Sequence, residues 1–379
     1  MSKGGRYLKQ NAVPKKKKKK VSTVKVVLLT LLTLTVIGIL GGIIVFNNML
    51  GLVERAEVVE KTDVTVDPAL LGNMEETESV ATETTEEPTT VPTTLPYTPS
   101  DLDIINVLVV GQAARDGEEY RYADTMILAT VNKNTKTLTL TSFLRDAYVD
   151  MPNYMGHSCG WNRINTVYHL GWTWGDTGGA MEMMNICLKD NYGIEVDYNV
   201  EIDFRAFEKI IDLLGGVTVE MTRDEAEYMI EHAPWEREDF WQFQEGSNWL
   251  SGEEALVYAR MRKAKGDNES DIKRTARQRG LVTLLLKKLV AMDFDTMMNM
   301  AKEVLPMITT DMTNDEITTC LWEILPLLPQ LKIEQGTCPV EGTYWGEVID
   351  LLGQPSSVLK FVAAEQKNLM KAITEGVTE

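Results

Sequence analysis

Histidine and cysteine are scarce in this chain of 379 residues, which contains three histidines and four cysteines. No CxxC pair occurs among the cysteines, which are Cys159, Cys187, Cys320 and Cys338. A structural zinc site needs four Cys or His ligands at characteristic spacings, so the composition argues against one. The chemistry of this chain is therefore expected to rest on other residue types.

Basic residues are also scarce once the amino terminus is set aside. The first 25 residues hold ten of the 38 Lys and Arg residues and no acidic residue. The remaining residues carry 28 basic and 56 acidic side chains, a formal charge of −28. Nucleic-acid binding requires a basic surface that neutralises phosphates, so this balance excludes a general role of that kind. Any phosphate-bearing ligand has to bind in a local basic pocket.

Charged residues are absent from Val26 to Phe46, a run of 21 residues rich in Leu, Val, Ile and Thr. A helix of this length crosses a hydrocarbon core of roughly 30 Å. A buried core helix and a cleaved signal peptide are the alternatives, but six lysines lie shortly before the run and no small-residue cleavage site follows it. The positive-inside rule predicts an uncleaved, single-pass membrane anchor over 26–46, with residues 1–25 in the cytoplasm. One or two disulfides are permitted outside the membrane, and Cys320 with Cys338 is one candidate pair.

Beyond the anchor, the chain divides by composition. Residues 47–100 lack hydrophobic periodicity and become rich in Thr, Glu and Pro, which predicts an extracytoplasmic stalk. From residue 101, apolar segments typical of buried strands alternate with helical patterns. This alternation predicts a layered α/β/α domain with a central mixed β-sheet over 101–292. Residues 293–379 are interpreted as a C-terminal extension packed on that domain.

The individual elements are expected from periodicity and from their start and stop signals. The expected strands are 104–110, 126–131, 138–143, 198–203, 217–221 and 331–334. The expected helices are 163–170, 179–191, 204–214, 252–260, 271–291, 295–305 and 314–328.

One basic cluster lies on the expected helix 271–291. At 100° per residue, Asp271, Arg274 and Gln278 fall within one narrow stripe, and Arg277 flanks it. Further along the helix the same stripe becomes apolar, at Leu281, Leu285 and Leu289. A lipid with an anionic headgroup would fit this change in character. The alternative is an amphipathic helix with an ion-paired first turn and a core-facing second half.

Four other segments place charged side chains at the ends of expected elements, where α/β proteins bind ligands. Arginine suits phosphate because its planar fork donates two parallel, charge-assisted hydrogen bonds. The candidates are Arg260 and Arg262 at the end of helix 252–260, Arg145 and Asp146 after strand 138–143, Arg163 at a helix start, and Asp124 as a Mg²⁺ ligand before strand 126–131. For each segment taken singly, an ordinary surface or core role is the alternative.

Together these segments form an ordered set that resembles the LytR-CpsA-Psr family of cell-wall glycopolymer transferases. The resemblance covers roughly residues 101–292, and a basic tail, one anchor and a stalk are the usual layout of the family. The matching motifs are Asn106–Gly111, Ala123–Ile127, Ser142–Asp146, Arg163–Asn165, Asp203-Phe204 with Leu214–Val217, Leu250–Arg262 and Arg274–Gln278.

The resemblance implies a phosphotransferase. Members of the family move a glycopolymer, such as a teichoic acid or capsule chain, from a polyprenyl (undecaprenyl) pyrophosphate carrier onto peptidoglycan, forming a phosphodiester. It implies that arginines hold the pyrophosphate, that an apolar tunnel holds the lipid, and that the protein resides in the cell membrane of a Gram-positive bacterium. The implied catalytic residues are Arg145, Arg260, Arg262 and Arg274, with Arg163, Gln278, Asp146, Asp271 and Arg277 as further substrate-binding candidates.

Two positions depart from the family pattern. Asp124 matches one of two magnesium-ligating aspartates, but Ala113 stands where the other is usual. Tyr122 replaces an arginine that is often present, although Arg121 adjoins it. Mg²⁺ is commonly held by one or two carboxylates plus substrate phosphates, so Asp124 alone could recruit it, or Asp116 could replace the missing aspartate. A protein that binds the lipid without transfer and a hydrolase of the lipid pyrophosphate are the alternatives to a transferase.

Overall fold

The computed structural model describes residues 48–61, 64, 66–73, 102–112, 121–232, 243–262, 270–324, 326–351 and 353–375. The described residues from Met49 onwards belong to one compact unit. The predicted tail and anchor, over 1–46, lie outside the described residues, as do Ala113 and Asp116. Among the described helices, none has the length and apolar character that a membrane span requires.

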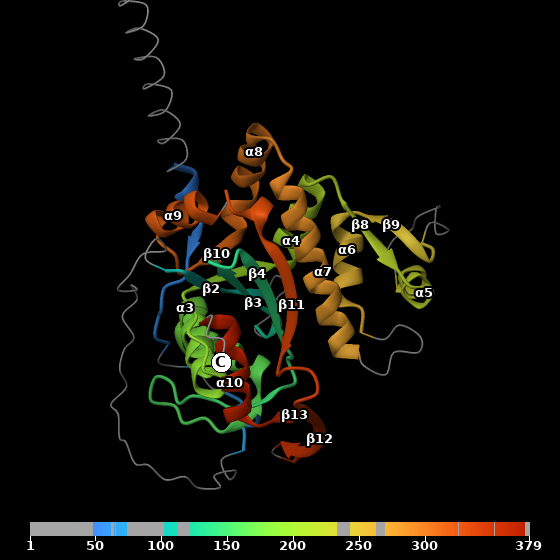
Figure 1. Ribbon diagram of the computed structural model, residues 1–379. Coiled ribbons are helices and arrows are strands. Elements are labelled where there is room, and N and C mark those ends of the chain that lie inside the picture. Colours follow the sequence, from blue (N-terminus) through green and yellow to red (C-terminus); the bar gives the residue numbers. More distant parts are fainter. Residues whose placement is uncertain are drawn as a thin grey trace, which may run out of the picture. The chain divides into compact units, whose positions relative to one another are not determined.

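A seven-stranded mixed β-sheet forms the centre of this unit (Figure 1), in the order β1-β10-β7-β2-β3-β4-β11. The three strands β2, β3 and β4 form an antiparallel meander, while β7 is parallel to β2 and β11 is parallel to β4. The strands of this sheet are β1 (Glu54–Arg55), β2 (Ile104–Gln112), β3 (Ala123–Asn132), β4 (Thr137–Phe143), β7 (Tyr198–Asp203), β10 (Ile308–Thr310) and β11 (Lys332–Cys338). Flanked by helices, this sheet confirms the predicted α/β fold.

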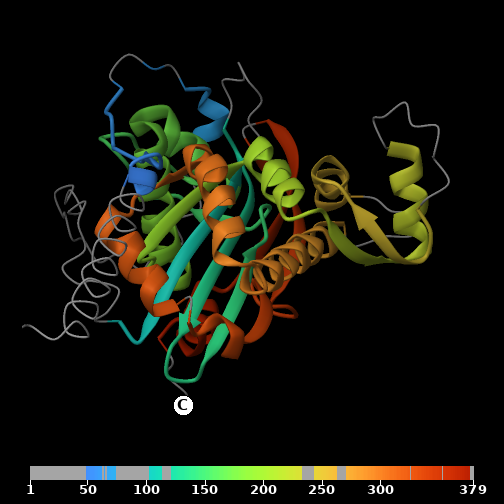
Figure 2. The same cartoon turned by 90° about the horizontal axis from the view of Figure 1, so that it is seen from above.

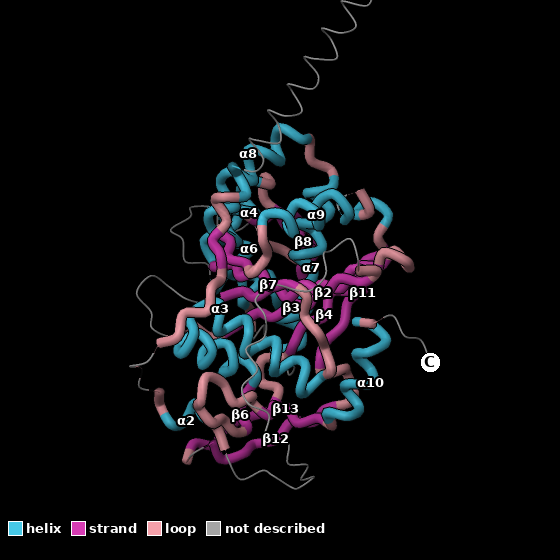
Figure 3. Tube along the Cα trace, turned by 90° about the vertical axis from the view of Figure 1, so that its left-hand side faces the viewer, coloured by secondary structure: helices cyan, strands magenta, loops and turns pink. Residues whose placement is uncertain are grey.

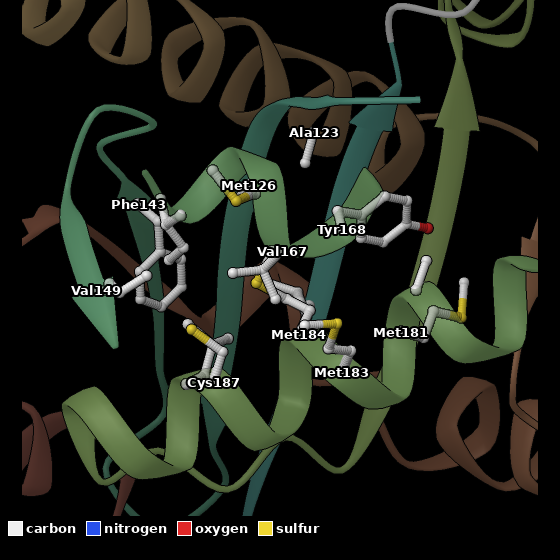
Figure 4. Packing of buried hydrophobic residues seen from close by; sticks show 14 of the residues in the cluster. Ala123, Met126, Phe143, Val149, Val167, Tyr168, Met181, Met183, Met184 and Cys187 are labelled. Carbon is white, nitrogen blue, oxygen red and sulfur yellow. The ribbon is translucent and has the colours of Figure 1, made fainter. Parts of the chain in front are cut away.

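Side chains along β3 alternate between the two faces of the sheet, as strand geometry requires. Met126 belongs to the buried cluster under α3, whereas Ile127 belongs to the cluster under α7. Figure 4 shows Met126, Phe143, Tyr168 and Met184 among the side chains that fill the space between the sheet and α3. The helices are α2 (Pro68–Leu71), α3 (Ile164–Tyr192), α4 (Phe204–Leu213), α5 (Arg223–His232), α6 (Gly252–Arg260), α7 (Ser270–Val290), α8 (Phe294–Val304), α9 (Asn314–Ile324) and α10 (Ala363–Thr374).

Helix α3 is kinked in its middle, where the sequence predicts a gap between two helices. Gly175 and Asp176 have non-helical backbone angles there, and Asp176 has a φ of +57°. The kink leaves carbonyl groups without helical partners. Those of Trp174 and Gly175 accept hydrogen bonds from the backbone N–H groups of Lys61 and Val59, at 2.7 and 3.1 Å. A segment near the start of the described chain is thereby fixed to α3.

We call this segment, residues 49–61, the N-terminal strap. Met49 and Leu50 are buried, and β1 within the strap adds an edge strand to the sheet next to β10. Further on, Asn73 pairs with Trp161 through two backbone hydrogen bonds of 3.1 and 3.0 Å. The predicted stalk is therefore wrong for the part of it that the structure describes before residue 74, because this part packs on the domain.

Helix α7 covers the other face of the sheet. Val282 and Leu286 pack against the strands, while Leu281 and Leu285, about 100° away around the helix, pack with α6, β8 and β9. Figure 2 shows α5 and the hairpin of β8 (Val217–Met221) and β9 (Gly246–Leu250) standing to one side, with α6 and α7 between them and the sheet. The described structure thus uses Leu281 and Leu285 as core residues.

Residues 293–379, predicted as an extension packed on the domain, also complete the sheet. Strand β10 pairs antiparallel with β7, and β11 pairs parallel with β4 over its whole length. Met370 of α10 enters the cluster beneath α3. The hairpin of β12 (Tyr344–Leu351) and β13 (Gln354–Phe361) lies close to the small pair β5 (Tyr148–Asp150) and β6 (Trp161–Arg163) (Figure 3). Residue 292 is therefore not a structural boundary.

All four cysteines are free thiols. Cys338 ends β11 and is buried in the cluster beneath α3, whereas Cys320 on α9 packs against the separate cluster of Ile105, Tyr198 and Met312. The candidate disulfide between Cys320 and Cys338 is not formed, because the two residues belong to different parts of the core.

Candidate functional site

Charged residues from distant segments converge at one edge of the central sheet. Arg145 and Asp146 follow β4, and Asp124 is the second residue of the neighbouring strand β3. Asp271, in the first turn of α7, is brought to the same place. The ends of two adjacent strands and the start of a helix thus build the core of the cluster predicted from the motifs.

Arg145 is the centre of this cluster. Its Nη1 lies 3.7 Å from Oδ1 of Asp124, and its Nε lies 3.6 Å from Oδ2 of Asp146 and 3.4 Å from Oδ1 of Asp271. The buried Nε has no hydrogen-bond partner within the described part of the chain. Three carboxylates therefore hold the guanidinium group by charge, while its N–H groups can still donate to an anion.

Arg274 is the most deeply buried arginine of the cluster, with 3% of its surface exposed. It forms an ion pair with Asp271, one helical turn earlier. Burial lowers the pKa of Arg274 and raises the pKa of Asp271, and in both cases the opposite charge of the partner counteracts the shift. Desolvation thus disfavours both charges, and the buried Nε of Arg274 has no hydrogen-bond partner among the described residues. An anion arriving at this point would supply the missing acceptor.

Arg262 reaches the cluster because helix α6 ends just before it. Ser251 begins the helix with a capping box, and the helix ends at Arg260. The backbone of Met261 leaves the helical conformation, with φ −55° and ψ 122°, and the Nη2 of Arg262 comes within 3.9 Å of Asp124 Oδ1. Arg260 is exposed, and its guanidinium carbon lies 4.7 Å from the centre of the Phe204 ring. The two arginines therefore occupy different environments.

Arg163 extends the cluster at the other end. It closes β6 immediately before α3, and its Nη1 lies 3.8 Å from Oδ1 of Asp146. Its side chain is 39% exposed. Arg163 and Arg145 thus share the carboxylate of Asp146.

Gln278 and Arg277 point to different sides of α7. Gln278 is buried beside the end of α6, where its Nε2 donates to the carbonyl O of Ala259 at 3.4 Å. Arg277 donates from Nε to Glu225 on α5 at 2.6 Å and from Nη1 to the carbonyl O of Met261 at 2.9 Å. Arg277 therefore fixes the backbone just before Arg262 and makes its described contacts outside the cluster.

Arg279 is a buried arginine that the motifs do not single out. It is 6% exposed, burial lowers its pKa, and its Nε and Nη1 have no hydrogen-bond partner in the described residues. On a helical wheel it falls 80° from Asp271 and therefore lies outside the stripe of Asp271, Arg274 and Gln278. The run of basic residues from Lys273 to Arg279 is the one sequence signal that includes it.

The cluster has a slight excess of positive charge. The four arginines in it face three aspartates, which leaves one formal positive charge; its members are Arg145, Arg163, Arg262, Arg274, Asp124, Asp146 and Asp271. The carboxylates orient the guanidinium forks before any ligand binds. Such an arrangement suits an anion with several oxygens, which can bind more than one fork at the same time.

A metal ion would find few protein ligands here. In the described ranges, no group of three His, Cys, Asp or Glu side chains is arranged to hold a metal. Asp124 contributes a single carboxylate, and two arginines lie within 4 Å of it. The described residues therefore do not build a Mg²⁺ site by themselves, and most of the ligands would have to come from a bound phosphate and water.

Comparison with known proteins identifies relatives of this chain. It is 31% identical over 212 residues to biofilm regulatory protein A of Streptococcus mutans, which covers 55% of this chain and 48% of that protein. It is 33% identical over 187 residues to the polyisoprenyl-teichoic acid–peptidoglycan teichoic acid transferase TagU of Bacillus subtilis, covering 49% and 52%. The chain thus spans about half of the length of these curated relatives.

Solved structures share the fold. The structure of TagT bound to LIIa-WTA matches with a TM-score of 0.56 and 23% identity, over 76% of this chain and 96% of that one. The protein gbs0355 from Streptococcus agalactiae matches with a TM-score of 0.57 and 22% identity, over 73% and 89%. A model of the LytR_cpsA_psr family matches residues 70–367, which include strands β10 and β11 and the β12–β13 hairpin beyond the segment that the motifs cover. The chain therefore belongs to the LytR_cpsA_psr family.

Proposed function

We propose that this protein transfers a glycopolymer from a polyprenyl pyrophosphate carrier onto peptidoglycan, forming a phosphodiester at the arginine cluster. The observation that carries the proposal is the convergence of Arg145, Arg262 and Arg274 from three distant segments upon shared aspartates. Buried guanidinium N–H groups without hydrogen-bond partners in the described chain are expected where an anionic ligand supplies the acceptors.

The relatives support this substrate class. Several are named as teichoic acid transferases, and one structure with the same fold, at a TM-score of 0.52, is that of a protein with bound octaprenyl pyrophosphate lipid. The anchor over 26–46, the extracytoplasmic placement of the domain and its position in a Gram-positive cell membrane are parts of the same proposal. They would bring the cluster to the side of the membrane where peptidoglycan lies.

The reaction needs little covalent work from the protein. The oxygen of an acceptor hydroxyl attacks the phosphorus that carries the glycan, and the bond from this phosphorus to the bridging oxygen breaks. Polyprenyl phosphate leaves with the electron pair, and the hydroxyl proton is released. Arg145, Arg262 and Arg274 are held in place beforehand, so they can stabilise the charge that develops on the leaving phosphate.

Mg²⁺ dependence forms a further part of the proposal and rests on Asp124. A bound Mg²⁺ would supply positive charge at the phosphate oxygens, and Asp124 would be its protein ligand. We expect Asp124→Asn to remove any stimulation of turnover by Mg²⁺. Asp116→Asn examines the second candidate carboxylate, and unchanged Mg²⁺-dependent turnover in that variant would rule Asp116 out.

The test uses the full chain in detergent with a polyprenyl pyrophosphate-linked glycan, stripped peptidoglycan and Mg²⁺. A transferase yields glycan joined to peptidoglycan through phosphate, detected by mass spectrometry. A hydrolase yields free glycan phosphate, and a binding protein returns the lipid intact; either outcome would reject transfer. Arg145→Ala should abolish the product, while Arg223→Ala, an exposed arginine on α5, serves as the matched control and should retain it.

A further inference from the structure

The β12–β13 hairpin is joined directly to the arginine cluster. Its two strands pair over their whole length, from Tyr344 opposite Phe361 to Leu351 opposite Gln354. On the inner side, the N–H of Leu359 donates to the carbonyl O of Asp146 at 2.8 Å. The carboxylate of the same Asp146 lies 3.6 Å from Nε of Arg145. One residue therefore supports both the hairpin and the centre of the proposed phosphate site.

A row of side chains runs from β5 onto one face of the hairpin. We call it the hairpin strip, and it consists of Tyr148 on β5 followed by Lys360, Glu347 and Trp345 on the hairpin. The Nζ of Lys360 lies 5.5 Å from the centre of the Tyr148 ring and 3.4 Å from Oε1 of Glu347. The Nε1 of Trp345 donates to Oε2 of Glu347 at 3.4 Å. Tyr148 is the pairing partner of Arg163 in the β5–β6 pair. The strip thus begins next to the cluster and leads away from it.

Trp345 is the unusual member of the strip, since 49% of this large side chain is exposed. Leu351 at the turn end of the hairpin and Val358 opposite Glu347 are buried against Tyr148, so the hairpin is already held by its own small core. Fixing the fold does not require a half-exposed indole at the other end. Exposed aromatic surface bordered by polar groups commonly marks a binding site.

The chemistry of the strip fits a sugar chain. The flat apolar face of a pyranose ring can pack on the indole of Trp345, and its hydroxyl and amide groups can bond to the carboxylate of Glu347 and the ammonium of Lys360. The strip has no surplus of positive charge, because residues 344–361 contain one basic and two acidic side chains. A polyanionic teichoic acid would be repelled by this segment, whereas an uncharged glycan face would not.

We infer that the hairpin strip binds the acceptor, a β-1,4-linked N-acetylhexosamine strand of peptidoglycan, and presents its hydroxyl to the arginine cluster. This inference rests on the proposed transfer reaction. The donor glycan is already held through its pyrophosphate and lipid, but the acceptor strand needs a binding surface of its own within reach of the same phosphorus. The strip starts at Tyr148, directly opposite Arg163 in the β5–β6 pair, and provides such a surface.

The experiment measures co-sedimentation of the full chain, in detergent, with peptidoglycan sacculi stripped of teichoic acid. Trp345→Ala should weaken sedimentation by about tenfold, as expected for losing one stacked ring, while Trp345→Phe should retain most of it. Trp322→Ala is the matched control, because Trp322 on α9 is 74% exposed and lies on another element. Chitotetraose should compete with the sacculi, and free teichoic acid should not.

Unchanged sedimentation of Trp345→Ala would overturn the inference, as would competition by free teichoic acid with no competition by chitotetraose. Binding of polyprenyl pyrophosphate separates this result from the fate of the proposed function. Trp345→Ala should bind the lipid normally, whereas Arg145→Ala should lose the lipid and still sediment with sacculi. A result that rejects acceptor binding by the hairpin strip would therefore leave pyrophosphate binding by the arginine cluster unaffected. A result that rejects pyrophosphate binding would likewise leave acceptor binding unaffected.

Discussion

Replacing Arg274 by alanine should weaken lipid binding and destabilise the domain by separable amounts. Arg274 is almost fully buried, and its ion-pair partner Asp271 has only 18% of its side chain exposed. Removing one partner of such a pair leaves an uncompensated buried charge, which costs about 3 kcal/mol of unfolding free energy. The guanidinium group would also make one or two charge-assisted hydrogen bonds to a pyrophosphate, worth together about 2–4 kcal/mol. This corresponds to a loss of affinity of about 30- to 1,000-fold.

The double variant Arg274→Ala with Asp271→Ala separates the two effects. It removes one positive and one negative charge, so the formal charge of the cluster stays the same. Much of the lost stability should return, because no unpaired buried carboxylate is left behind. The affinity for pyrophosphate should stay low, because the oriented N–H groups of Arg274 are missing. If net charge alone determined lipid binding, the double variant would bind the lipid as tightly as the unmodified protein. If the oriented N–H groups of Arg274 determine it, the double variant binds weakly.

The assay combines urea unfolding with binding of a polyprenyl pyrophosphate by the full chain in detergent. Arg223→Ala controls for the loss of an exposed arginine and should change neither measurement beyond about 0.5 kcal/mol. If the double variant binds the lipid as tightly as the unmodified protein, the buried fork of Arg274 has no part in holding the pyrophosphate, and the reasoning is refuted.

Three further predictions concern other parts of the molecule. Burial raises the pKa of Asp311 from 3.8 to about 6, so the free energy of unfolding should fall by about 3 kcal/mol as pH rises from about 4 to about 6. Asp311→Asn should flatten this slope in urea unfolding at a series of pH values, and an unaltered slope would contradict the assignment. Gly178→Ala should loosen the N-terminal strap, because its Cβ would lie 2.2 Å from the carbonyl carbon of Glu57, and limited proteolysis should then cut within residues 49–61. Arg277→Leu releases the carbonyl of Met261 and should lower kcat/KM about tenfold by displacing Arg262, and normal kinetics would contradict that positioning role.

Sequence patterns predict the long and strongly periodic elements of this fold well. Helix 252–260 begins at the predicted residue because Ser251 and Glu254 form its capping box. Strand 217–221 alternates between buried and exposed residues along its length. Such local signals act within a few residues of the chain, so they can be recognised before the fold is known.

The N-terminal strap could not be predicted in the same way. Its strand β1 has two residues, which is too short for any periodicity, and its partners are the distant strand β10 and the kink of α3. Composition also misleads here, because the Thr-, Glu- and Pro-rich residues that follow dominate the character of the whole region. The strap is therefore recognised only from its tertiary contacts with β10 and α3.

The members of the candidate site were predictable only in part, since the predicted Arg260 and Arg277 make their described contacts outside the cluster, and the pairing within the site was not predictable. The motifs identify Arg145, Arg262 and Arg274 because these residues fall at marked positions in an ordered set. Which aspartate holds which guanidinium group depends on how β3, β4 and α7 meet, and no local pattern contains that information. Arg277 shows the limit most clearly, because its contacts are made with Glu225, on a helix 52 residues away in the sequence.

The two hydrogen bonds between Asn73 and Trp161 attach the chain to the domain just before the Thr- and Pro-rich segment begins. With the strap before it and β2 after it both built into the same sheet, residues 74–101 form an insertion whose two ends belong to one folded body. A protease that cuts once inside this insertion would not release the domain. The two fragments should elute together in a native column and separate only in denaturant, because the strap and β2 pair within the same sheet.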